Sequence, residues 1–175
     1  MLYTRKGDSG TTKDFKSAPG ERKSKSSCQT EALGALDELN SFLGLAKAKS
    51  RTPEIIQWIQ NSLFTVQAEV AGADKRIGQG KVLEMEVWID SIEKELPPIK
   101  TFFISGGTEL SALLDVSRTL ARKAERRVIA GAEAGEFKLD PATLAFLNRL
   151  SSLLYALARL TNHKSGITEQ PPSYK

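Results

Sequence analysis

The sequence is poor in the residues that many enzymes use for covalent and metal chemistry. Its 175 residues include one cysteine, Cys28, and one histidine, His163. A single cysteine cannot form a disulfide within the chain, which favours a reducing compartment. One histidine with one cysteine excludes most zinc-ligand sets, and any Ser-His-Asp triad would have to use His163. The paired Glu-x-x-His motifs that a di-iron helical bundle needs are also absent.

Long apolar runs are missing as well. No stretch approaches the roughly 18 apolar residues of a membrane span, and the N-terminal MLYTRKGDSG lacks the apolar core of a signal peptide. We therefore expect a cytoplasmic protein that does not enter a membrane. With 40% hydrophobic and 26% charged residues, the composition is typical of a globular protein. The length predicts a single domain over residues 1–175.

The positive charge gathers at one end of the chain. The net charge is +4, and residues 1–26 hold seven Lys or Arg against three Asp or Glu, so the remainder is neutral. A basic segment rich in Gly, Ser and Thr suggests a polyanionic partner. A solvated, flexible tail would explain the charge alone equally well.

Helical periodicity begins near residue 30 and continues through most of the chain. Apolar residues recur every three or four positions in five segments, which cover residues 30–51, 53–72, 82–96, 108–131 and 140–162. Residues 2–4 favour a short strand, residues 72–81 a connection, and residues 102–104 an extended piece. The pattern predicts an all-α fold, with a five-helix bundle over 27–165 between a basic segment, 1–26, and a tail, 166–175.

The fourth predicted helix carries the clearest candidate site. Arg118, Arg122 and Glu125 lie on one line at the edge of its apolar stripe, with Arg126 just beyond. Two arginines oriented by a carboxylate can hold phosphate oxygens through their planar guanidinium groups. A solvated charged face would show the same spacing, although the position beside the core favours binding.

Three further segments have suitable chemistry without being specific. Residues 3–12 combine glycines, basic residues and hydroxyls, as phosphate-binding loops do, although a disordered tail would look alike. Residues 105–108 place two glycines before a capped helix, which suits an anion or close packing, while a plain turn is the simpler interpretation. Gly34, Asp37, Ser41 and Gly44 form a small polar face that predicts a subunit contact or the floor of a site. Tolerated glycines beside a solvated aspartate are the alternative.

Four blocks of the sequence resemble the PduO-type ATP:cob(I)alamin adenosyltransferases, or corrinoid adenosyltransferases. They are residues 3–12 with 20–22 and Lys25, residues 31–41, residues 102–126, and residues 146–151. Their order and spacing agree along essentially the whole chain. The resemblance implies a ferritin-like five-helix bundle that assembles as a homotrimer with its sites between subunits. It also implies that the 5′-deoxyadenosyl group of ATP moves to the cobalt of cob(I)alamin, with release of triphosphate.

The resemblance implies roles for individual residues. The residues implied to bind ATP are Thr4, Arg5, Lys6, Gly7, Thr12, Lys13, Lys25, Arg122, Lys123, Glu125, Arg126 and Asn148. Arg118 would pair with Asp37 across the subunit interface, and Phe102 would face the corrin and help to remove the lower ligand of cobalt. With Arg122, these three residues form the expected catalytic set.

The resemblance also implies the cofactor and the partners. Mg²⁺ would sit on the triphosphate, with no metal held by protein ligands alone, and cobalamin would be a substrate. A reductase and an adenosylcobalamin-dependent acceptor enzyme would be partners, whereas nucleic acid and membranes would not. Three positions depart from the family pattern: Ser105 replaces a usual proline, Asp115 a common histidine, and Lys123 a frequent arginine. Lysine keeps the charge but loses the bidentate geometry.

Two other classes of function fit parts of the sequence. A nucleic-acid-binding helical domain would place the basic segment and the fourth helix on phosphates, but no recognised binding module is visible. A non-enzymatic adaptor bundle would explain the helices but not the clustered basic segment or the arginine line. Adenosyl transfer suits the composition better, because Co(I) is itself the nucleophile. The protein then needs to position the reactants and to neutralise the leaving triphosphate.

Overall fold

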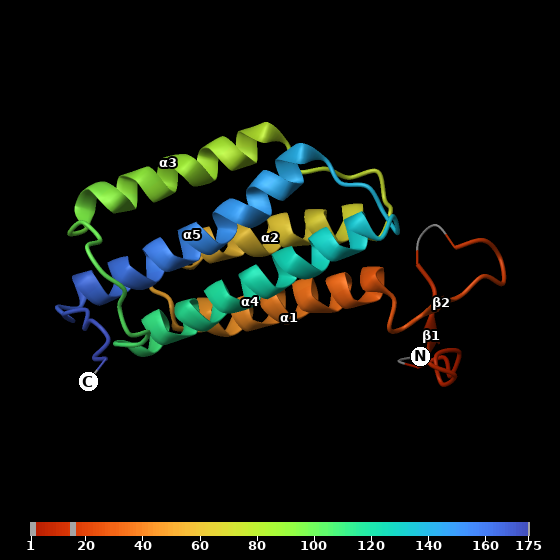
Figure 1. Ribbon diagram of the computed structural model, residues 1–175, viewed down its shortest axis with the longest axis horizontal. Coiled ribbons are helices and arrows are strands. Elements are labelled where there is room, and N and C mark those ends of the chain that lie inside the picture. The colour runs from red at the N-terminus through yellow and green to blue at the C-terminus, as the bar shows by residue number, and fades with distance from the viewer. Residues whose placement is uncertain (1–2, 15–16, 175) are drawn as a thin grey trace.

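Five helices form the body of the protein in a computed structural model that describes residues 3–14 and 17–174 (Figure 1). The helices are α1 (Cys28–Lys49), α2 (Pro53–Val70), α3 (Gln79–Glu95), α4 (Glu109–Glu133) and α5 (Pro141–Lys164). Helices α1, α3 and α5 run in one direction along the bundle, and α2 and α4 run in the other (Figure 1). The predicted all-α, five-helix fold is confirmed. Within the described ranges, no helix is both long and apolar enough to cross a membrane.

Side-chain caps fix where three of the helices begin. The hydroxyl of Thr108 accepts a hydrogen bond from the amide of Ser111, and the carboxylate of Asp140 accepts one from Ala142, as the sequence indicated. Helix α1 begins two residues earlier than predicted, because Ser27 caps it. Helix α3 begins at Gln79, so the predicted connection over 72–81 is three residues too long at its end.

Helix α4 lies against both α1 and α5, and its buried face consists mostly of small side chains, with Leu114 and Val128 as the larger ones. Ser117, Ala121 and Ala124 are fully buried there. Small side chains allow helix axes to approach closely, and long ones would keep them apart. On the facing helices the core is completed by leucines of α1, such as Leu39, and by Phe146 of α5. This packing leaves the polar positions of α4 at the margins of its two interfaces.

The N-terminal segment forms a small hairpin beside the end of the bundle where α1 begins (Figure 1). Strand β1 (Thr11–Thr12) pairs antiparallel with β2 (Lys23–Ser24). The predicted strand over 2–4 is wrong for Tyr3 and Thr4, which lie outside any strand, and Leu2 lies outside the described residues. The Nζ of Lys23 donates to Gln29 of α1 at 2.7 Å. This bond joins the hairpin to the bundle.

A buried carboxylate joins α2 to the start of α5. Glu69 is only 2% exposed. Its carboxylate accepts hydrogen bonds from the amide of Asp140 at 2.7 Å and the hydroxyl of Thr143 at 2.5 Å. The guanidinium of Arg76 lies 3.6 Å away. A buried charge with this many partners is stabilising only while all of them remain in place.

We expect Glu69→Ala to destabilise the protein strongly, because the mutation leaves the buried hydroxyl of Thr143 and the partly buried amide of Asp140 without an acceptor. The free energy of unfolding, measured by urea denaturation, should fall by about 3 kcal/mol. Glu54→Ala, at an exposed position in the first turn of the same helix, is the control and should cost less than about 1 kcal/mol. Equal unfolding midpoints for the two variants would contradict this role of Glu69.

Candidate active site

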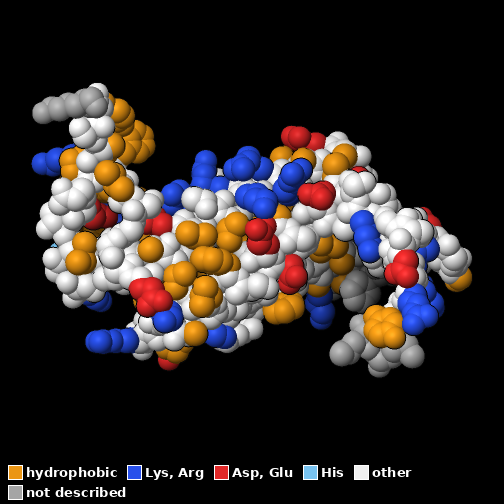
Figure 2. Space-filling model, turned by 90° about the horizontal axis from the view of Figure 1, so that it is seen from below, with side chains coloured by type: hydrophobic (Ala, Val, Ile, Leu, Met, Phe, Trp, Pro, Cys, Tyr) orange, Lys and Arg blue, Asp and Glu red, His pale blue; other side chains and the backbone are white. Residues whose placement is uncertain are grey.

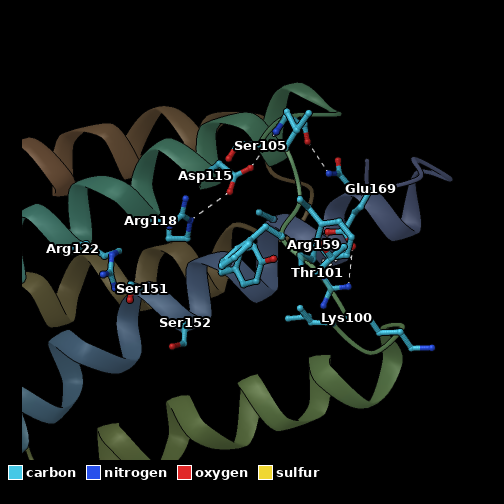
Figure 3. A pocket seen from close by; sticks show the side chains of 18 residues that line it. Lys100, Thr101, Ser105, Asp115, Arg118, Arg122, Ser151, Ser152, Arg159 and Glu169 are labelled. Carbon is cyan, nitrogen blue, oxygen red and sulfur yellow. Dashed lines mark hydrogen bonds and ion pairs between the residues drawn. The ribbon is translucent and has the colours of Figure 1, made fainter. Parts of the chain in front are cut away.

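A cavity of about 760 Å³ opens between α4, α5 and the loop that joins α3 to α4 (Figure 3). Phe102 comes from the loop, and Arg118 and Arg122 come from α4. The structure therefore brings three of the predicted catalytic residues to one cavity. Phe102 is 79% exposed, so it is not a core residue. A large aromatic side chain held in solvent at the rim of a cavity is available to a ligand.

A glycine turn fixes the loop against α5. Gly106 and Gly107 have φ values of 126° and 111°, which side-chain-bearing residues rarely adopt. A Cβ atom at Gly107 would lie 2.3 Å from the Oδ1 of Asn162. The amide of Asn162 donates to the carbonyl of Gly106 at 2.7 Å and accepts from Thr108. The turn thus serves close packing, which was one of its three interpretations from the sequence.

Asp115 connects this turn to the arginine line. One carboxylate oxygen accepts a hydrogen bond from the amide of Gly106 at 3.2 Å. The other lies 3.6 Å from the Nε of Arg118, whose guanidinium is also 5.9 Å from the centre of the Tyr155 ring. Figure 3 shows Asp115 between Ser105 and Arg118. Within the described ranges, the buried Nε of Arg118 makes no hydrogen bond, so this guanidinium retains a donor.

A second cavity, of about 470 Å³, lies further along α4 and is lined by the hairpin and by α1. Thr12, Lys25 and Lys123, all predicted to bind ATP, line it. The Nζ of Lys123 lies 2.6 Å from the carboxylate of Glu38 on α1. A Cβ atom at Gly7 would lie 3.1 Å from the Nζ of Lys25, so the absence of a side chain there lets this lysine approach the loop.

Two more predicted residues meet between α4 and α5. The amide nitrogen of Asn148 donates to Glu125 at 3.1 Å, and its oxygen accepts from Arg149 at 2.8 Å. Arg149 in turn binds Glu86 of α3 at 2.9 Å. A chain of polar contacts thereby crosses three helices beside the arginine line. It holds the amide of Asn148 in one orientation.

Several predicted residues are exposed and lie apart from the first cavity. These residues are Thr4, Arg5, Lys6, Lys13, Asp37 and Arg126. The N-terminal segment lies at one end of the bundle and the Phe102 loop at the other (Figure 1). Seen from below, the molecule shows hydrophobic side chains in the middle of one face and a row of Lys and Arg along its edge (Figure 2). One chain alone does not bring all the predicted groups together.

The hairpin also contains a strongly stabilised ion pair. Asp14 lies 2.6 Å from the Nζ of Lys23 and accepts a hydrogen bond from Ser17. Burial would raise the pKa of Asp14, but the bonds from Lys23 and Ser17 outweigh it and lower this pKa to about 2. Because its pKa is lowered in the folded state, the Asp14 carboxylate stabilises the folded hairpin at pH values above the ordinary aspartate pKa. This stabilisation is lost as the pH falls towards 2. At neutral pH the charge on Asp14 therefore supports the basic segment.

Three lining residues on α5 were not predicted from the sequence. Tyr155, Arg159 and Asn162 follow Ser151 at spacings of four, four and three residues, and all four line the first cavity. This polar stripe on a helix otherwise rich in leucine was the signal that could have found them. Burial raises the pKa of Tyr155. Within residues 3–14 and 17–174, no group of three or more His, Cys, Asp or Glu side chains is placed to hold a metal ion.

Comparison with known proteins identifies relatives of this chain. A family model described as cobalamin adenosyltransferase matches residues 2–161. A corrinoid adenosyltransferase of Bacillus subtilis is 37% identical over 95% of this chain and 89% of its own length. Corrinoid adenosyltransferase PduO of Citrobacter freundii is 36% identical over 93% of this chain, which spans 50% of that protein.

Solved structures share the fold along its whole length. A variant PduO-type ATP:corrinoid adenosyltransferase from Lactobacillus reuteri, complexed with cobalamin and ATP, matches with a TM-score of 0.89 at 27% identity. The match covers 99% of this chain and 97% of that one. A second variant of the Lactobacillus reuteri protein, complexed with ATP, matches with a TM-score of 0.87 at 28% identity, and the match covers 98% of this chain. Sequence and fold together show that this chain belongs to the cobalamin adenosyltransferase family.

Proposed function

We propose that this protein transfers the 5′-deoxyadenosyl group of ATP to the reduced cobalt of a corrinoid and releases triphosphate. The observation that carries the proposal is the meeting of Phe102, Arg118 and Arg122 at one cavity. An exposed aromatic ring suits the flat apolar surface of a corrin, and two guanidinium groups suit phosphate oxygens. The names of the relatives, and the cobalamin and ATP bound in the related structure, support the same reaction.

The nucleotide side of the proposed mechanism needs charge in fixed positions. Co(I) attacks C5′ of ATP, a cobalt–carbon bond forms, the C5′–O bond breaks, and triphosphate leaves with the electron pair. Arg122 and Lys123 on α4, with Lys25 and the basic loop from Thr4 to Gly7, would neutralise the negative charge that gathers on the leaving group. Glu125 and Asn148, already hydrogen-bonded to each other, would hold the nucleoside end.

The corrinoid side needs an apolar surface that excludes water from cobalt. Phe102 stands at the rim of the cavity on a loop whose turn is fixed to α5. Its ring would occupy the lower face of cobalt, where a ligand or a water molecule would otherwise coordinate. Cobalt without its lower ligand is more easily reduced to Co(I). Phe102 thereby prepares the nucleophile without taking part in the bond exchange.

We further propose that the protein is a homotrimer with its sites between subunits. The basic segment and the Phe102 loop lie at opposite ends of one chain (Figure 1), so a neighbouring copy would bring them together. Asp37 is exposed on α1 beside the exposed Gly34 and Ser41, which permits close approach of another helix. The side chain of Arg118 is 27% exposed, so an Asp37–Arg118 pair between copies would use its accessible guanidinium nitrogens and not the buried Nε.

Mg²⁺ fits this site only as a companion of the nucleotide. No cluster of three ligating side chains exists in the described ranges, so the ion would be held mainly by triphosphate oxygens, as Mg²⁺ commonly is. There it would reduce the charge of the leaving group. A reductase that supplies Co(I) and an enzyme that accepts the adenosylated corrinoid complete the proposed partners. The cytoplasm is the proposed location, because the single cysteine suits a reducing compartment.

The test of the proposed function is an assay with chemically reduced cobalamin and Mg-ATP. We expect the absorbance of a light-sensitive cobalt–carbon bond to appear, with one triphosphate released per product. A thermal-shift measurement accompanies it, with Mg-ATP, with ATP without metal, and with an oligonucleotide. Stabilisation by the oligonucleotide alone would favour a nucleic-acid-binding domain, and stabilisation by none of these ligands would favour an adaptor.

Arg122→Ala is expected to be the most damaging single loss on the nucleotide side. Removing one preorganised group that stabilises charge typically lowers the rate by about 10²–10³. The measurement is turnover at saturating ATP. Arg51→Ala removes the same side chain from an exposed position in the turn after α1, and it should leave turnover unchanged. Retention of more than about a third of the wild-type rate by Arg122→Ala would refute the assignment.

Phe102→Ala is expected to slow the reaction from Co(II) more than the reaction from pre-reduced Co(I). The ring acts before the transfer, so ATP affinity should be nearly unchanged. Because Phe102 is mostly exposed, the melting temperature should also change little. Phe64→Ala, at an exposed phenylalanine of α2, is the matched control. Equal losses from both cobalt states would remove the role in ligand displacement.

Asp37→Ala is expected to weaken both the trimer and ATP binding, because Arg118 would lose its partner between copies. Sedimentation velocity measures the assembly, and calorimetric titration measures the affinity for ATP. Asp90→Ala, at an exposed position on α3, should change neither quantity. A wild-type protein that sediments as a monomer at concentrations where it is active would rule out the interface.

A further inference from the structure

The loop that carries Phe102 depends on the C-terminal segment for part of its support. Residues 97–106 contain no helix or strand. The amide of Ile104 donates to the carbonyl of Gln170 at 2.9 Å, so the loop and the segment after α5 share a backbone hydrogen bond. This contact lies two residues from Phe102. The segment therefore holds the loop at a second point, besides the glycine turn.

One buried arginine connects α5, the loop and the C-terminal segment. Arg159 is 5% exposed. Its Nε lies 2.9 Å from Oε1 of Glu169, and its Nη2 lies 2.8 Å from Oε2 and 3.1 Å from the carbonyl oxygen of Pro97. Its guanidinium also stands 5.3 Å from the centre of the Phe103 ring. A single side chain thus contacts both the start and the middle of the loop.

The pair is built to stay charged and in one orientation. A bidentate arginine–carboxylate contact fixes both planes and is stronger than a contact between neutral groups. The hydrogen bonds that Arg159 donates to Glu169 raise the pKa of Arg159, although burial opposes the shift. A buried guanidinium that loses its carboxylate is strongly destabilised, so it would leave this position or draw in water. Either response would break the hydrogen bond to the carbonyl of Pro97 and the contact with the ring of Phe103.

We infer that the Arg159–Glu169 pair is a positioning device for the corrinoid side of the site, which holds the loop so that Phe102 stands at the rim of the cavity. The inference rests on the proposed function. Figure 3 shows Arg159 and Glu169 together on the side of the cavity away from Arg118 and Arg122. Loss of the pair should therefore impair the corrinoid side and spare the nucleotide side. Neither residue takes part in the bond exchange.

The first test measures the loop directly, in full-length protein without ligands. Glu169→Gln keeps the size of the side chain and removes its charge. Hydrogen–deuterium exchange over residues 98–106 should become about tenfold faster or more, as expected for loss of a charge-assisted contact. Exchange over α2 should not change. Glu95→Gln removes the exposed pair with Lys164 near the same end of the bundle, and it should leave the loop unchanged.

The second test separates a positioning role from a general loss of stability. In Glu169→Gln the KM for the corrinoid should rise by about tenfold. The spectrum of the Co(II) corrinoid bound to this variant should show a smaller four-coordinate fraction than with the wild-type protein. The KM for ATP should stay the same, although the loss of a buried ion pair lowers the melting temperature. Glu169→Asp, which keeps the charge on a shorter side chain, should recover part of the corrinoid affinity.

Three results would overturn the inference. Exchange over 98–106 that is unchanged in Glu169→Gln would show that the pair does not hold the loop. Equal increases in the KM for ATP and for the corrinoid would make the pair a general structural contact. A wild-type protein that transfers no adenosyl group would remove the proposed function itself, and with it the corrinoid role of the pair. The exchange experiment would then still report how the loop is held.

Discussion

The buried face of α4 is the constraint on which the rest of the molecule depends. Because Ser117, Ala121 and Ala124 have almost no side-chain bulk, α1 and α5 approach α4 closely from both sides. The residues between them then fall at the margins of the two interfaces. Lys123 reaches Glu38 of α1, and Glu125 reaches Asn148 of α5. Larger side chains on that face would move both helices and separate these pairs.

The loop before α4 holds a large apolar ring, that of Phe102, exposed to solvent. A phenylalanine gains nothing from exposure, so the backbone around it must be fixed by other contacts. The carbonyl of Gly106 accepts a hydrogen bond from Asn162, and its amide donates one to Asp115. The amide of Ile104 donates to the carbonyl of Gln170. These hydrogen bonds hold the loop in place, although the exposed Phe102 ring contributes little to folding. Such an arrangement is common where a side chain binds a ligand.

The helices could be predicted from the sequence because their signals are local. Apolar spacing, the caps at Thr108 and Asp140 and the prolines gave the number and order of helices, and the family motifs gave the candidate residues. Contacts distant in sequence could not be read in this way. The hairpin pairs Thr11 with Ser24 in a ladder of only two pairs. Apolar spacing also cannot decide between two neighbouring leucines of α4: Leu113 is only half-buried, whereas Leu114 is buried, because the position of α1 and α5 sets that face.

The close approach of Gly107 to Asn162 restricts how this protein can change. A methyl group at Gly107 would overlap the amide of Asn162, and the same amide holds the turn in place, so neither position can vary alone. Ile99 and Ile104 are each at least half exposed and carry neither this restriction nor the role proposed for Phe102. Adaptation to corrinoids of different shape, in nature or by design, can therefore draw on these two side chains while Phe102 and the turn stay the same.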